Sequence, residues 1–87
     1  MSVEEFVGLE LARVPGVEQV LTSPGEDMLV WTVVNHASEE VHYRIYDREG
    51  ALLDMFPDQG FDFYVLDRRG RQVEELVTGM KPIFQRH

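Results

Sequence analysis

The residue whose type and position are best suited to chemistry is Asp62, in the segment GFDFYVLD at 60–67. The segment alternates as a strand does, so Asp62 shares a face with Tyr64 and Leu66. A carboxyl group buried on that face without a partner would hold its proton and could serve as a functional acid. In the structural alternative, which we favour, the carboxylate caps a backbone amide or pairs with an arginine.

The histidines and serines offer weaker chemistry. His36 and His42 lie on either side of a predicted helix start, so they do not share a face. His36 and Glu40 meet only if that helix begins earlier, and two ligands without a third do not define a zinc site. None of the serines has the histidine and acid that a nucleophilic serine needs. We therefore expect no catalytic residue, no metal and no cofactor.

The bases of the C-terminal half indicate a contact surface instead. The turn DRRGR contains Arg68, Arg69 and Arg71, and Phe84 lies in a later apolar segment. These residues could meet an acidic protein partner, although a solvated turn is the simpler interpretation. Acids interrupt the positive charge, whereas nucleic-acid binding needs a basic face that releases counterions. We predict no nucleic-acid partner.

Composition and charge limit the class of protein. The 87 residues suffice for a single domain over 1–87 with one small core. The net charge is −8, and residues 1–43 hold eight acids against the single base Arg13. The absence of cysteine suits a reducing cytoplasm, and the acidic N-terminus does not resemble a signal peptide. No apolar run is long enough to cross a bilayer, so we predict a cytoplasmic protein without a membrane partner.

The first part of the chain predicts one helix and two strands. Ser2 begins a capping box, and apolar residues then recur at helical intervals, which predicts a helix over about 3–13. The segment VEQVLTS at 17–23 alternates in part and indicates a strand. The segment MLVWTVV at 28–34 is apolar on both faces, which is typical of a central strand with Trp31 in the core.

The segment VHYRIYDREGALLDMF at 41–56 has two interpretations. As a hairpin, VHYRIYD alternates and DREG turns the chain back, and a similar DRRG follows the strand at 60–67. As a helix, it is capped by Ser38, ended by Pro57 and weakened by about 1 kcal/mol by Gly50 in its interior. Its apolar stripe would consist of Val41, Ile45, Tyr46, Leu52, Leu53 and Phe56. We favour the helix.

The last part of the chain completes the predicted fold. GFDFYVLD is a strand, RQVEELVTG contains a short helical turn, and KPIFQR at 81–86 is an edge strand because Pro82 cannot donate to a central ladder. We therefore predict an α+β domain with a mixed, mainly antiparallel sheet of about four strands. Two helices cover one face, and the element order is α-β-β-α-β-β.

Over roughly residues 14–86 the chain resembles a set of small uncharacterised bacterial α+β proteins. The shared features are a VWTV strand, a helix of the type V-Y-x-x-E and a P-D…D-F strand. The resemblance implies that the middle segment is helical, with Glu49 at the position of the helix glutamate. It implies no particular reaction.

A more distant likeness is to the minimal nucleotidyltransferase core, which also runs helix, strand, strand, helix, strand. That family holds metals and nucleotide phosphates with three acids that converge on one sheet edge. Here the available acids are Glu26, Asp27 and Asp62, but Leu29 stands where the second acid of the family's D-x-D pair should be. The likeness implies at most a degenerate nucleotide- or metal-binding domain.

Two classes of function follow from the sequence. We favour a non-enzymatic interaction or accessory module that associates with itself or with another protein, through an edge strand such as KPIFQR and aromatic surfaces. The alternative is the degenerate nucleotidyltransferase-like domain. It requires Glu26, Asp27 and Asp62 to converge in the folded chain.

Overall fold

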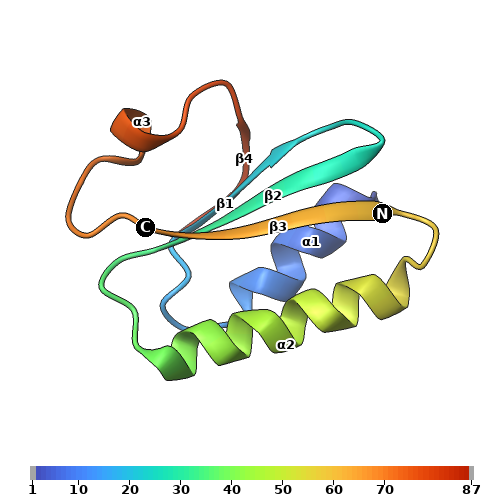
Figure 1. The fold of residues 1–87 in the computed structure, drawn as a ribbon, viewed down its shortest axis with the longest axis horizontal. Coiled ribbons are helices and arrows are strands. Elements are labelled where there is room, and N and C mark those ends of the chain that lie inside the picture. Colours follow the sequence, from blue (N-terminus) through green and yellow to red (C-terminus); the bar gives the residue numbers. More distant parts are fainter. Residues whose placement is uncertain (1, 87) are drawn as a thin grey trace.

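The computed structural model describes residues 2–86, in which one four-stranded sheet carries two helices on one face (Figure 1). The elements are α1 (Val3–Ala12), β1 (Gln19–Ser23), β2 (Asp27–Val34), α2 (Glu39–Met55), β3 (Gly60–Asp67), α3 (Val73–Leu76) and β4 (Lys81–Gln85). The predicted α+β class and mixed sheet are confirmed. The short helix α3 adds one element to the predicted order, between β3 and β4.

The strands lie in the order β3-β2-β1-β4. β1 is antiparallel to both β2 and β4, but β2 and β3 are parallel along their whole length, from Asp27 opposite Gly60 to Val34 opposite Asp67. The predicted mainly antiparallel sheet is therefore corrected at this long pairing. The cause is α2, because a helical crossover carries the chain back along the sheet so that the next strand runs parallel.

Local capping signals position both long helices. The Ser2 hydroxyl accepts a hydrogen bond from the Glu5 amide at 3.2 Å, and the Ser38 hydroxyl accepts one from the Val41 amide at 3.4 Å. On α2, Arg44 donates to Glu40 at 2.7 Å. The helical interpretation of the middle segment is thus confirmed, and the hairpin interpretation is wrong.

Both helices pack on the same sheet face and bury the main core. Ile45 and Leu52 of α2 are fully buried there, together with Val30 and Val34 of β2. The predicted apolar stripe was too wide, because Tyr46 and Leu53 remain 52% and 48% exposed. Each is one residue, or about 100° around the helix, beyond Ile45 or Leu52. They lie on the flank of α2 rather than beneath the sheet.

The opposite sheet face is only partly covered. Leu21, Val33 and Val73 form a second, smaller cluster, in which the segment around α3 folds over β1 and β2. Trp31 is partly buried against this cluster and stacks on Tyr64, with ring centroids 5.2 Å apart. The smaller cluster partly covers Leu66 of β3 but leaves Asp62 and Tyr64 exposed to solvent.

Gly50 weakens α2 without a packing reason within the chain. A Cβ atom built at this position would meet nothing within 4 Å. We expect Gly50→Ala to raise the free energy of unfolding by about 0.5 to 1 kcal/mol, because alanine loses less conformational entropy in a helix. Urea unfolding of dilute protein measures the change. A loss of stability would show that the position is crowded within a single chain.

Candidate interaction surface

The three acids of the nucleotidyltransferase alternative do not assemble a site. Asp27 and Asp62 lie on neighbouring strands, but Asp62 is opposite Leu29, so the two acids are offset by two residues. Both are exposed, as is Glu26, and the hypothesis of a buried acid at Asp62 is wrong. Within residues 2–86, no group of three or more His, Cys, Asp and Glu side chains is arranged to hold a metal ion.

The predicted basic surface is engaged in internal contacts. Arg68 donates to both carboxylate oxygens of Glu18, at 2.7 and 3.4 Å, and Arg71 lies 3.5 Å from Glu75. Phe84 is partly buried against the main core. Arg69 alone of the predicted set is exposed without an ion pair among the described residues, and it sits at a turn with a left-handed φ of 47°. These residues do not form one free basic face.

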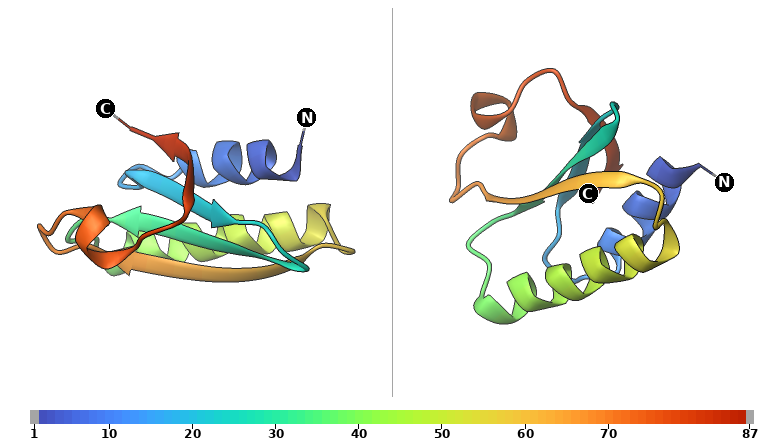
Figure 2. Two further views of the ribbon diagram at one scale, coloured as in Figure 1. Left: turned by 90° about the horizontal axis from the view of Figure 1, so that it is seen from above. Right: turned by 45° about the vertical axis from the view of Figure 1, so that its right-hand side comes forward.

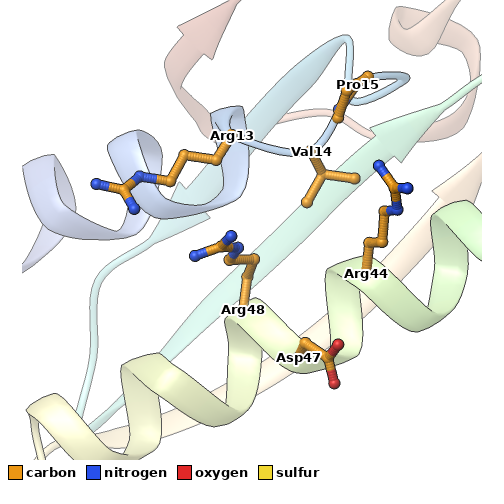
Figure 3. A pocket seen from close by; sticks show the side chains of 6 residues that line it. All are labelled: Arg13, Val14, Pro15, Arg44, Asp47 and Arg48. Carbon is orange, nitrogen blue, oxygen red and sulfur yellow. The ribbon is translucent and has the colours of Figure 1, made fainter.

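A hollow of about 280 Å³ lies between the end of α1 and the first half of α2, with three arginines around it. Figure 3 shows that the guanidinium group of Arg44 lies on the opposite side of Val14 from those of Arg13 and Arg48. Arg48 is paired with Glu10 at 2.9 Å, and Arg44 with Glu40. The positive charges therefore do not converge, and both arginines of α2 are already paired, so the hollow is not an anion site.

The carboxyl ends of the parallel strands β2 and β3 are a second place where ligands commonly bind in open sheets. Here the polar groups are used to join two loops. The Asp67 carboxylate accepts hydrogen bonds from the amides of His36, Ala37 and Arg69 at 2.8, 3.1 and 3.0 Å. Asn35 accepts one from the amide of Gly70 at 2.7 Å.

The pKa of Asp67 reflects these contacts. Partial burial on its own would raise the pKa, but the backbone amides of His36, Arg69 and Ala37 together outweigh it and lower the pKa. A carboxylate whose lone pairs are occupied in this way is a structural anchor. It holds the loop before α2 against the turn after β3.

The two outer edges of the sheet differ in how they are protected. β4 has five residues, contains Pro82 and meets β1 with an irregularity at Val20 and Leu21, all of which disfavour a further strand. β3 has eight residues, no proline and an unbroken register with β2. Within residues 2–86 it pairs with β2 alone, so its outer side is a free edge.

The flank of α2 continues this free edge. α1 contacts the other flank of α2, where Glu10 pairs with Arg48. At 100° per residue, Tyr46 and Leu53 lie about 160° and 140° from Arg48, so they face away from α1 and toward the β3 side. Figures 1 and 2 show α2 running alongside β3 in the opposite direction, and no other helix or strand of residues 2–86 lies on the outer side of the pair.

We call this region the β3–α2 surface and define it as the free edge of β3 together with Tyr46, Glu49, Gly50 and Leu53. Glu49 lies between Ile45 and Leu53 around the helix. It is partly buried, and one of its carboxylate oxygens has no hydrogen-bond partner in the described chain. Burial raises the pKa of Glu49 to about 7. Sequence reasoning missed this surface because it treated Tyr46 and Leu53 as core.

No helix in the described part of the chain is long and apolar enough to cross a membrane. No family model, curated protein or solved structure matches the chain. Neither resemblance drawn from the sequence is therefore supported by a known relative.

Proposed function

We propose that this chain is a non-enzymatic protein-interaction module that binds through the β3–α2 surface. The observation that supports the proposal is the free, eight-residue edge of β3, which has neither the proline nor the irregularity that β4 has. Unprotected edges of this length readily accept another strand. In most proteins an edge strand is short, charged or covered by another element, unless it serves to bind a partner.

Exposed apolar side chains beside the edge give the proposal a second support. Tyr46 and Leu53 are about half exposed, and Tyr64 on the open face of β3 is 48% exposed. Tyrosine is enriched at protein interfaces because it buries a large area at a small cost in side-chain entropy. The main chain of β3 would supply affinity, and these side chains would supply specificity.

Matched charge substitutions test whether the surface binds protein. Leu53→Lys and Leu9→Lys add the same charge at leucines that are 48% and 57% exposed, but Leu9 lies on α1, away from the β3–α2 surface. We expect tagged wild-type and Leu9→Lys chains to retain the same protein from host extract, identified by mass spectrometry. The Leu53→Lys chain should lose it. Retention of the same proteins by all three chains would contradict the proposal.

A further inference from the structure

We propose that the partner is a second copy of this chain, joined by antiparallel pairing of the two β3 edges about a two-fold axis perpendicular to the sheet. The inference rests on the proposed function and names its partner. A two-fold axis requires one patch to complement itself. The β3–α2 surface meets that requirement in its main chain, its layer spacing and its side chains.

The main-chain groups of β3 are positioned for self-pairing. The Arg68 amide donates to the Val34 carbonyl at 2.9 Å, so even-numbered residues of β3 direct their amide and carbonyl groups to β2. Phe61, Phe63 and Val65 therefore direct theirs outward. With Phe63 opposite Phe63 of the second copy, Phe61 is opposite Val65. These pairs can exchange about six main-chain hydrogen bonds.

The spacing of the layers allows α2 to join the contact. The axis keeps the helices of both copies on the same side of an eight-stranded sheet. α2 packs beneath β2 and β3 (Figure 2), so the two copies of α2 would be two strand spacings, about 10 Å, apart. Packed helices lie about 8 to 10 Å apart. Tyr46 and Leu53 face this gap, and Gly50 narrows the helix beside it.

The side chains on the open face also suit a second copy. In the Phe63-centred register, Asp62 of each copy is opposite Tyr64 of the other, so the two carboxylates at the middle of the strands do not oppose one another. Like charges directly opposite would destabilise the pairing. The aromatic ring of Tyr64 is already held by its stacking on Trp31, which limits the entropy lost on association.

The size of the surface sets the expected affinity. Eight strand residues and the 17 residues of α2 are each about 25 Å long, and a strand with a helix beneath it is about 15 to 20 Å deep. Each copy would bury about 400 to 500 Å², near the lower limit for specific dimers. We therefore expect a dissociation constant of about 1 to 100 µM.

Sedimentation equilibrium of the purified chain between about 1 and 500 µM tests the dimer. We expect the wild-type chain and Leu9→Lys to dimerise with equal affinity, and Leu53→Lys to weaken dimerisation about tenfold or more. A wild-type monomer throughout this range would overturn the inference. If the monomer still retains a different host protein through Leu53, the proposed function stands and only the partner is wrong. If neither association occurs, both fail.

Charge substitutions at Tyr64 test the register. Tyr64→Lys and Tyr64→Glu both lose the stacking on Trp31, but only lysine faces Asp62 of the second copy with an opposite charge. We expect Tyr64→Lys to dimerise at least about tenfold more tightly than Tyr64→Glu. Leu9→Lys and Leu9→Glu control for the change in net charge and should differ little. Equal affinities for the two Tyr64 variants would overturn the antiparallel pairing centred on Phe63.

Discussion

Asp67→Ala is expected to lower the free energy of unfolding by about 2 to 3 kcal/mol, measured by urea unfolding at pH 7. The substitution removes one carboxylate that accepts from the amides of His36, Ala37 and Arg69. His36 and Arg69 both have left-handed backbone conformations, with φ of 52° and 47°. Without the anchor, two strained residues lose the hydrogen bonds that hold them.

The pH dependence gives this prediction a second measurement. Because the pKa of Asp67 is lowered on folding, its contribution is present above the ordinary value of 3.8 and is lost as the pH falls through the folded value. The stability difference between wild type and Asp67→Ala should therefore shrink below about pH 4. Asp67→Asn keeps one acceptor oxygen, so its free energy of unfolding at pH 7 should lie between those of wild type and Asp67→Ala. Equal stability of wild type and Asp67→Ala at pH 7 would contradict the anchoring role.

The helices were predictable because their signals are local. Ser38 caps α2, and Pro57 follows its end closely, so a few neighbouring residues determine where the helix begins and stops. The two similar segments DREG at 47–50 and DRRG at 67–70 could be assigned to different structures for the same reason. The first segment lies within the capped helix, whereas Gly70 of the second segment sits in a turn with a φ of 79°.

The edge position of β4 was predictable from Pro82 and is confirmed, but the free edge of β3 and the β3–α2 surface were not predictable from neighbouring residues. Whether β3 has one strand neighbour or two depends on pairings between distant segments, and the sequence of β3 is apolar enough for either position. The strand, helix, strand order does indicate a parallel crossover, and this signal was available at residues 28–67. The exposure of Tyr46 and Leu53 depends in turn on where the edge of the sheet ends above α2.

Glu49→Gln is expected to stabilise the chain by about 1 to 2 kcal/mol at pH 8 and to change it little at pH 5. Burial raises the pKa of Glu49 from 4.5 to about 7, so the folded chain holds a proton that the unfolded chain releases. The stability that this proton contributes is fully present below pH 4.5 and is lost as the pH rises through about 7. In a fully buried group the shift would correspond to about 3 kcal/mol, and partial exposure reduces it.

Urea unfolding from pH 5 to pH 8, at a protein concentration well below the dissociation constant expected for the dimer, keeps association from contributing to the measurement. Wild type should lose stability across this range, and Glu49→Gln should remain nearly constant because glutamine does not ionise. Asp54→Asn removes an exposed acid from the same helix and should retain the wild-type pH dependence. If Glu49→Gln also loses stability toward pH 8, another group must release the proton. Glu49 would then be hydrated in the folded chain, and this would contradict the partial burial of its carboxylate on the flank of α2 that belongs to the β3–α2 surface.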